Sequence, residues 1–129
     1  MPDLTAAKEW MRIAHMDFSS AKYLQGHRPL PVEIICYHCQ QAAEKAIKAV
    51  FVFHETNVPH IHDLTKLIVA AAQHEDSLHS LFPQANRLTN YATFTRYPSD
   101  IEITEEDMKI ALSYTKDILS QVEDLFLNS

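Results

Sequence analysis

Hydrophobic residues recur every three or four positions along most of the chain, which is the spacing that places them on one face of a helix. The first such segment runs from about Leu4 to Gln25, and Gly26 with the nearby prolines Pro29 and Pro31 ends it. Polar and basic residues occupy its opposite side. The pattern predicts a long amphipathic helix, whose apolar stripe contains Ala7, Trp10, Met11, Ala14, Phe18, Ala21 and Leu24.

A second segment, from about Val32 to Glu55, is the most apolar part of the chain. Apolar residues cover most of its circumference and leave one narrow polar stripe. A helix of this kind contacts neighbours on more than one side, so we predict that it lies at the centre of the fold. The polar stripe consists of His38, Gln41, Glu44, Lys45 and Lys48.

Two shorter segments follow. Asp63 can cap a third helix, which we expect to fade over residues 74–77. Pro83 suits the first turn of a fourth helix, and the apolar pattern carries that helix through Tyr91 and Ala92.

The last segment begins at Thr104, after a predicted loop from Arg96 to Ile103 in which Pro98 is the helix breaker. Three acidic residues follow Thr104, as suits the first turn of a fifth helix. No segment predicts a strand, and amphipathic helices with short connections pack as antiparallel bundles. We therefore expect an all-α fold, an up-and-down antiparallel bundle of about five helices in a single domain, residues 1–129.

The composition is typical of one globular domain and excludes several classes of function. Of the 129 residues, 47% are hydrophobic and 22% are charged. The single glycine, Gly26, excludes the glycine-rich phosphate loops, which need several glycines in a short span. The net charge of −6 excludes a general basic field for binding duplexes but leaves a local basic patch open. We therefore expect no DNA partner.

No stretch approaches the roughly 18 apolar residues of a membrane span, and the first residues lack the features of a signal peptide. We therefore expect a cytoplasmic protein with no membrane partner, in which Cys36 and Cys39 are reduced.

Cys36 and Cys39 form a CxxC motif. In a redox protein such a motif follows a strand, and in a zinc site it is one half of a set of about four ligands. Neither condition is met, so the two cysteines are predicted to be small packing residues.

Two other groups of residues could bind a ligand. His60, His62 and Asp63 alternate along a loop, but they offer too few ligands for a metal, and Asp63 is better explained as a helix cap, so we expect no metal site. Asp17 lies beside the apolar stripe of the first helix. Because buried acids usually have partners, it is either a structural hydrogen-bond acceptor or part of a site.

The polar stripe of the second helix has two interpretations. It can be a solvated surface with an ion pair, since Glu44 precedes Lys48 by four residues. It can also face a cleft or a second subunit, where Lys45 or Lys48 would meet a phosphate.

After the fourth helix, Arg96 can hold a phosphate through two parallel hydrogen bonds and Tyr97 can stack on a base, although both also suit an ordinary loop. No GxSxG or other catalytic set is present, and we predict no catalytic residue.

The run from Gln40 to Ala49, QQAAEKAIKA, resembles the HEPN domain family, small helical domains of prokaryotes and higher eukaryotes. His62-Asp63-Leu64 is similar to the motif that opens the family's third helix. Tyr91 followed by Arg96-Tyr97-Pro98 is similar to the segment after the fourth helix. These pieces keep the family's order along nearly the whole chain, and the first-helix pattern is matched by Trp10, Ala14, Asp17 and Ala21.

The resemblance implies an up-and-down bundle, frequently a homodimer, with a role linked to nucleotides or RNA. Some relatives are thought to bind nucleotides, some act beside a minimal nucleotidyltransferase as partner or toxin, and others are metal-independent RNases with an Arg-x(4–6)-His motif. No histidine follows at that spacing after Arg12, Arg28, Arg87 or Arg96. The pair that would steady phosphate charge and transfer protons is missing, so RNA is not the favoured partner.

Three hypotheses follow. The first is a non-catalytic nucleotide-binding accessory protein, a partner of a minimal nucleotidyltransferase in a toxin-antitoxin-like module, with a nucleotide such as ATP or GTP as ligand and no other cofactor. The second is a pure protein-interaction subunit without a ligand. The third is a divergent metal-independent RNase or toxin that uses His62 or Glu44. In the first hypothesis the nucleotide-binding residues are Arg96, Tyr97, Lys45, Lys48, His38 and His62.

Overall fold

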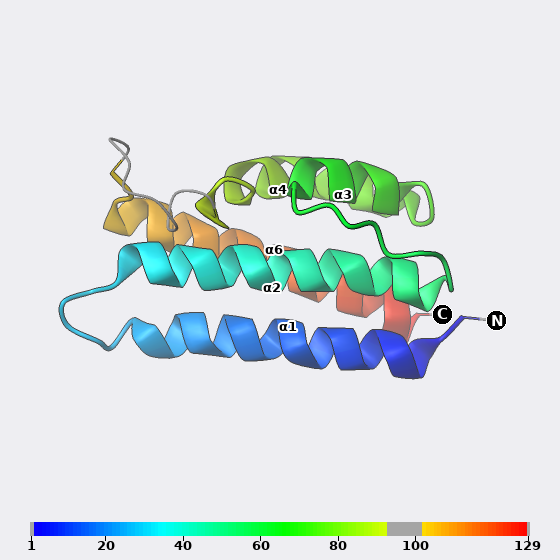
Figure 1. The fold of residues 1–129 in the computed structure, drawn as a ribbon, viewed down its shortest axis with the longest axis horizontal. Coiled ribbons are helices and arrows are strands. Elements are labelled where there is room, and N and C mark those ends of the chain that lie inside the picture. Colours follow the sequence, from blue (N-terminus) through cyan, green and yellow to red (C-terminus); the bar gives the residue numbers. More distant parts are fainter. Residues whose placement is uncertain (1, 93–101, 129) are drawn as a thin grey trace.

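The computed structural model describes residues 2–92 and 102–128, and within these ranges the chain contains helices and no strand. Two long antiparallel helices, α1 (Leu4–Leu24) and α2 (Val32–Phe53), lie side by side, and α6 (Glu105–Leu127) packs against both of them (Figure 1). The all-α bundle is therefore confirmed.

A shorter layer covers the side of α2 away from α1 (Figure 1). It consists of α3 (Leu64–Ala72), the 3-10 helix η1 (Asp76–Leu81) and α4 (Phe82–Leu88). The helix α2 consequently contacts α1, α3, α4 and α6, which confirms its predicted central position. Small side chains allow this close approach on several sides, and those with no exposed surface are Ala42, Ala43, Ala46 and Ala49.

Side chains cap the starts of α3 and α6, and the cap predicted at Asp63 is confirmed. The Asp63 carboxylate accepts hydrogen bonds from the backbone N–H groups of Thr65 and Lys66 at the start of α3. Thr104 and Asp107 form a capping box at the start of α6, in which each side chain accepts a hydrogen bond from the other residue's backbone N–H. These caps satisfy N–H groups that the helices themselves leave without partners.

The helix α2 ends in a left-handed turn. Glu55 has φ 57°, its N–H donates to the carbonyl of Val52, and the N–H of Thr56 donates to the carbonyl of Phe51. This pair of bonds is the Schellman motif, in which glycine usually occupies the left-handed position. The turn reverses the chain, so that the segment before α3 runs back along α2 (Figure 1) and brings His62 onto its polar face.

Two elements differ from the prediction. The segment expected to fade after α3 forms η1, because Leu78 and Leu81 are both buried and residues three apart align on one side of a 3-10 helix. The fourth helix, which was predicted to continue through Tyr91 and Ala92, is interrupted, because α4 ends at Leu88 and a turn at Thr89 and Asn90 follows before Tyr91 and Ala92 are helical again. Thr89 in that turn accepts a hydrogen bond from the N–H of Leu64, which joins the end of α4 to the start of α3.

In the ranges that the structure describes, we find no helix that combines the length and the apolar character of a membrane span.

Candidate functional site

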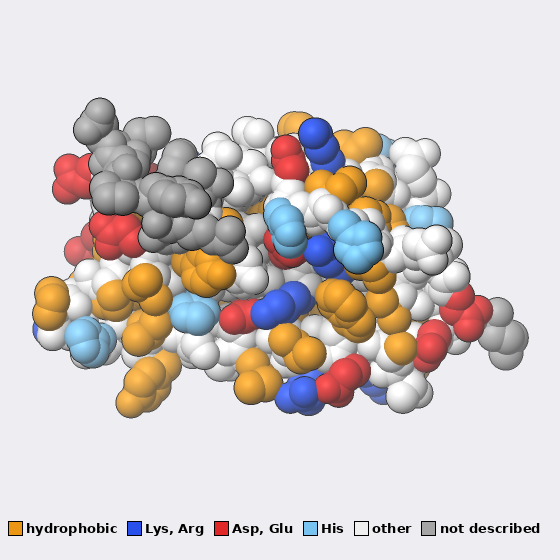
Figure 2. All heavy atoms as spheres, viewed as in Figure 1, with side chains coloured by type: hydrophobic (Ala, Val, Ile, Leu, Met, Phe, Trp, Pro, Cys, Tyr) orange, Lys and Arg blue, Asp and Glu red, His pale blue; other side chains and the backbone are white. Residues whose placement is uncertain are grey.

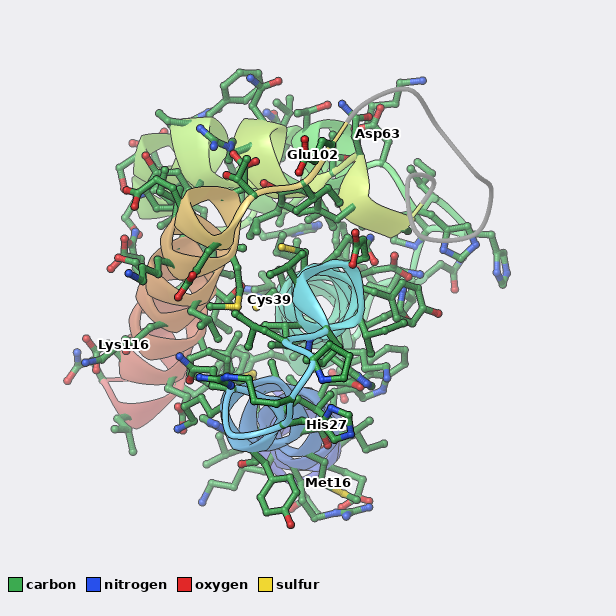
Figure 3. All side chains as sticks on the ribbon, turned by 90° about the vertical axis from the view of Figure 1, so that its left-hand side faces the viewer. Met16, His27, Cys39, Asp63, Glu102 and Lys116 are labelled. Atoms are coloured by element: carbon green, nitrogen blue, oxygen red, sulfur yellow. The ribbon has the colours of Figure 1, made fainter. Side chains whose placement is uncertain are left out.

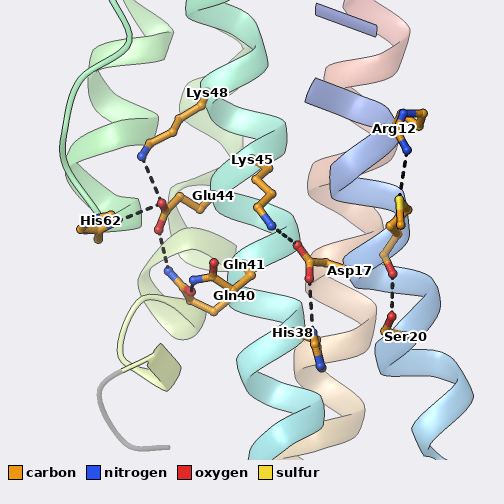
Figure 4. Close-up of polar contacts among 11 residues, drawn as sticks. Arg12, Asp17, Ser20, His38, Gln40, Gln41, Glu44, Lys45, Lys48 and His62 are labelled. Atoms are coloured by element: carbon orange, nitrogen blue, oxygen red, sulfur yellow. Dashed lines mark hydrogen bonds and ion pairs between the residues drawn. The ribbon is translucent and has the colours of Figure 1, made fainter. Parts of the chain in front are cut away.

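Glu44 is the centre of a hydrogen-bond network on the polar face of α2 (Figure 4). Its side chain is only 9% exposed, yet its carboxylate has three donors. Lys48 Nζ and His62 Nδ1 each lie 3.0 Å from Oε2, and Gln40 Nε2 lies 3.2 Å from Oε1. A buried carboxylate requires such partners because it has lost its hydration. The predicted Glu44–Lys48 ion pair is present, but both residues are buried, so the expectation of a solvated surface is wrong for this part of the stripe.

Two glutamines extend this network from Glu44 toward the surface. Gln40 has no exposed surface, and its side-chain amide connects Glu44 on one side with Gln41 on the other. The Nε2 of Gln41 donates to the Oε1 of Gln40 over 2.7 Å. The buried amide of Gln40 therefore has a partner for its oxygen and one for its N–H group.

Asp17 is the centre of a second network that joins α1 to α2 (Figure 4). Its carboxylate accepts a hydrogen bond from Lys45 Nζ and another from His38 Nδ1, the latter over 3.3 Å. Its side chain is largely buried between the two helices. Asp17 is therefore a hydrogen-bond acceptor that orients two of the candidate nucleotide-binding residues.

The four candidate residues on this face retain hydrogen-bonding capacity. A lysine ammonium has three N–H donors, and Lys45 and Lys48 each use one of them in the bonds above. The two histidines face carboxylates with Nδ1, so that nitrogen carries the proton, and Nε2 accepts when the ring is neutral and donates when it is protonated. Exposure differs among the four: His62 is 80% exposed and Lys45 is 30% exposed, whereas Lys48 is only 11% exposed.

The structure thus groups the candidate residues in pairs around two carboxylates. His38 and Lys45 lie at Asp17, and Lys48 and His62 lie at Glu44. Figure 2 shows lysine, histidine and acidic side chains gathered along the middle of this face. The other two candidates, at positions 96 and 97, lie outside the described residues.

Two participants, Gln40 and Gln41, were not among the residues proposed from the sequence as site residues, whereas Asp17 was singled out there as either a structural acceptor or part of a site. A signal for Gln40 was nevertheless present, because it is a polar residue on the apolar side of a helix, where a side chain needs a buried partner. Asp17 carried the same signal in the first helix. No comparable sequence signal distinguished Gln41, since a glutamine on a polar stripe is ordinary.

An ion pair between α4 and α6 is a further feature that the sequence did not predict. Arg87 Nη2 lies 2.6 Å from Asp107 Oδ1, at the edge of a surface hollow of about 300 Å³. The pKa of Asp107 is held below its ordinary value, mainly by the hydrogen bond from the backbone N–H of Thr104. The hydroxyl of Thr104 and the guanidinium of Arg87 lower it further. Arg87 therefore supports the start of α6 and is already engaged with a carboxylate.

The two cysteines are buried free thiols that lie on the core side of α2, and Cys39 points toward α6 (Figure 3). Burial raises the pKa of Cys36 to about 12 and that of Cys39 to about 11, although a hydrogen bond with Thr115 opposes the rise at Cys39. Because the thiolate is the reactive form, both groups are inert at neutral pH, as expected of packing residues. Among the residues described, no three His, Cys, Asp or Glu side chains are placed to hold a metal ion.

A second cationic region lies between α1 and α6. Lys22, Lys109 and Lys116 line a hollow of about 420 Å³, and Lys116 projects outward from α6 (Figure 3). No carboxylate orients these three ammonium groups within the part of the chain that the structure describes. This hollow is a local basic patch of the kind that the net charge of the chain still allowed. Replacement of one of its lysines can serve as a control for replacement of a lysine on the face of α2.

The fold and the site define a class of protein: a small helical-bundle domain whose central helix carries a polar face built on buried glutamine, glutamate and lysine. Comparison with known proteins narrows this class. The model of the HEPN domain family matches residues 7–125, which is nearly the whole chain. The chain therefore belongs to the HEPN domain family, as its QQAAEKAIKA run indicated.

Solved structures agree with this assignment. TT1696 from Thermus thermophilus is 26% identical, with a TM-score of 0.80 over 92% of this chain and 96% of that one. ST0689, described as an archaeal HEPN homologue, is 23% identical, with a TM-score of 0.75 over 93% of this chain and 97% of that one. The second similarity concerns the fold alone. No curated protein matches the chain.

Proposed function

We propose that this HEPN domain is a non-catalytic accessory subunit that binds a nucleotide on the polar face of α2, acts as a homodimer and pairs with a minimal nucleotidyltransferase. One observation carries the nucleotide assignment. Two lysines and two histidines from α2 and the following segment lie on one face, and buried or largely buried carboxylates hold each of them in place.

This arrangement suits a phosphate group for two reasons. Each lysine keeps two N–H donors beyond its carboxylate contact, and each histidine presents Nε2 away from its carboxylate partner. The side chains are also already oriented, so that less conformational entropy is lost when a ligand binds. The charges of Lys45 and Lys48 balance those of Asp17 and Glu44, so this face offers a phosphate oriented N–H donors rather than a strong positive field.

The absence of the Arg-x(4–6)-His motif supports a binding role over an RNase role. In the described residues Glu44 and His62 do form a carboxylate–histidine pair, but Glu44 is buried and fully engaged by three donors. A carboxylate in this position orients its neighbours rather than exchanging protons with a substrate.

The test is thermal unfolding of the purified protein with ATP, GTP and their diphosphates, each with and without Mg²⁺. A ligand at about 100 times its dissociation constant adds about 2.7 kcal/mol of stability, which raises the midpoint by several degrees for a domain of this size. We expect such a rise and its loss in Lys45→Ala and Arg96→Ala.

Lys109→Ala is the matched control, because Lys109 is a lysine of the second cationic region on another side of the bundle. If Lys109→Ala abolishes the rise and Lys45→Ala does not, the assignment to the face of α2 is wrong. If no nucleotide changes the midpoint, the nucleotide-binding function itself is wrong, and co-purification with a nucleotidyltransferase then tests the interaction-subunit hypothesis.

A further inference from the structure

The second cationic region groups three lysines that have no counter-charge. Lys22 of α1 and Lys109 and Lys116 of α6 are all exposed, and none of them forms an ion pair within the described residues. Four other cations of the chain each contact a carboxylate, namely Arg12, Lys45, Lys48 and Arg87. Because like charges repel one another, grouping three ammonium groups raises the free energy of the folded chain, and a bound anion lowers it again.

The carboxylates of α6 do not supply that anion. Asp107 and Asp117 contact residues of α4, and Glu123 contacts a histidine of α1. Glu105 and Glu106 precede the first lysine of α6 by about one turn, but in the part of the chain that the structure describes neither lies within ion-pair distance of a lysine. The region is therefore open to an anion from another molecule.

The rest of the lining indicates what else this ligand carries. Phe18 and Leu112 give the hollow apolar side chains beside the three ammonium groups. Phe18 is itself buried, and Lys22 Nζ lies over its ring, 4.7 Å from the centroid. This cation–π contact covers the ring face, so a nucleobase does not stack there without displacing the lysine. The lining suits an anion that carries an aliphatic chain.

We infer that the second cationic region is a docking site for an acidic, glutamate-rich segment of another protein. A glutamate side chain joins two methylene groups to a carboxylate. Its methylene groups can pack on Leu112 while the carboxylate accepts a charge-assisted hydrogen bond from an ammonium group. The inference does not rest on the proposed nucleotide function, because α1 and α6 form this region and the nucleotide site is assigned to the face of α2.

The spacing of the lysines agrees with a peptide. Lys109 and Lys116 are seven residues apart, so they lie on nearly the same side of α6 and are separated by roughly 10.5 Å of helix rise. An extended peptide rises about 3.3 Å per residue, so three or four residues cover this length and offer several carboxylates to the three lysines. The phosphate groups of an inorganic oligophosphate share bridging oxygens and are closer together than this, so they match the spacing less well.

The experiment measures fluorescence anisotropy of a labelled hexaglutamate peptide as the wild-type protein is added at pH 7, with labelled hexaglutamine as the neutral control. An ionic strength of about 0.1 M limits the range of charge interactions to roughly 10 Å, so that the local lysines rather than the net charge of the chain determine binding. We expect hexaglutamate to bind and hexaglutamine not to bind.

Two variants identify the lysines. Lys109→Gln and Lys116→Gln keep most of the side-chain length but remove the charge. Each should weaken hexaglutamate binding about threefold, as expected for one exposed ion pair, and the double variant about tenfold. Lys66→Gln, at an exposed lysine of α3, changes the net charge equally and should leave the dissociation constant unchanged. The unfolding midpoints should not fall, because the replaced lysines have no carboxylate partner within the described residues.

The contrary outcomes are distinct. If hexaglutamate does not bind, or if Lys66→Gln weakens binding as much as Lys109→Gln, the region is not a docking site for an acidic segment. If hexauridylate RNA or tripolyphosphate binds more tightly than hexaglutamate and requires the same lysines, the ligand carries phosphate groups and the assignment to an acidic protein segment is wrong. The nucleotide function is tested separately through Lys45, so neither result decides it.

Discussion

Replacement of Glu44 by glutamine tests whether the network on α2 is an essential part of the folded state. The variant keeps the shape of the side chain but removes its negative charge, so that the ammonium of Lys48 stays buried without a counter-charge. Both side chains are nearly inaccessible, at 9% and 11% exposure. A charge in that position retains its full desolvation cost, whereas an exposed charge would recover its hydration.

The magnitude follows from this burial. Removing one partner of a buried ion pair costs roughly 3–5 kcal/mol, and we expect about 3 kcal/mol here because the glutamine oxygen still accepts one hydrogen bond. Unfolding entropy of about 2.1 cal/mol/K per residue corresponds to roughly 0.27 kcal/mol/K for this chain. The unfolding midpoint of Glu44→Gln should therefore fall by about 11 °C.

The assay is thermal and urea unfolding of Glu44→Gln, Lys48→Met and the double variant, with Glu9→Gln as control. Glu9 pairs with Arg12 on the surface of α1, where both side chains are more than half exposed, so its replacement should leave the midpoint unchanged. The double variant has no unpaired charge and should be more stable than Glu44→Gln. A loss below about 1 kcal/mol in Glu44→Gln, or additive losses in the double variant, would refute the reasoning.

Three further predictions concern other parts of the chain. Because burial raises the pKa of Cys36 to about 12 and that of Cys39 to about 11, thiol protonation stabilises the fold fully below the ordinary pKa of 9.0, and this contribution is lost as the pH rises through the folded values. Stability should therefore decline above about pH 9, and Ellman's reagent at pH 8 should label only unfolded protein; rapid labelling of the native state would contradict the burial. Thr104→Ala removes the side-chain half of the capping box and should cost about 1 kcal/mol in urea unfolding, and no loss would mean that the cap is redundant. Glu55→Gly relieves a left-handed residue at the end of α2 and should raise stability by roughly 0.5–1 kcal/mol, whereas a decrease would show that the Glu55 side chain contributes more than its backbone strain costs.

Much of the fold could be predicted from the sequence because each long helix carries its own periodic pattern. The spacing of apolar residues located α1, α2 and α6. Asp63, as a cap, and the acidic residues after Thr104 indicated two helix starts. The region between α3 and α6 was harder, because its elements are short. The burial of Leu78 and Leu81 in a 3-10 helix and the turn at Thr89 depend on contacts with α3 that a local pattern does not contain.

The candidate site was predicted only in part, for the same physical reason. The polar stripe of α2 identified Lys45, Lys48 and His38 by their helical spacing. Their partners come from elsewhere: Asp17 lies on α1, and His62 lies on the segment after α2. Tertiary packing decides which carboxylate pairs with which lysine or histidine. The periodicity of a single helix does not contain this information.

The burial of Gln40 and Glu44 has a consequence for how α2 chooses its rotation in the bundle. Alanines cover so much of this helix that several of its faces could pack against a neighbour with similar apolar burial. A shift of one residue turns the helix by about 100° and would carry the Gln40 amide and the Glu44 carboxylate away from their partners. A buried amide or carboxylate without hydrogen-bond partners is costly. The alternative rotations of α2 are therefore excluded, because each would leave these two groups buried and without partners. In this domain the polar residues of the central helix specify the register, and the apolar residues supply the burial.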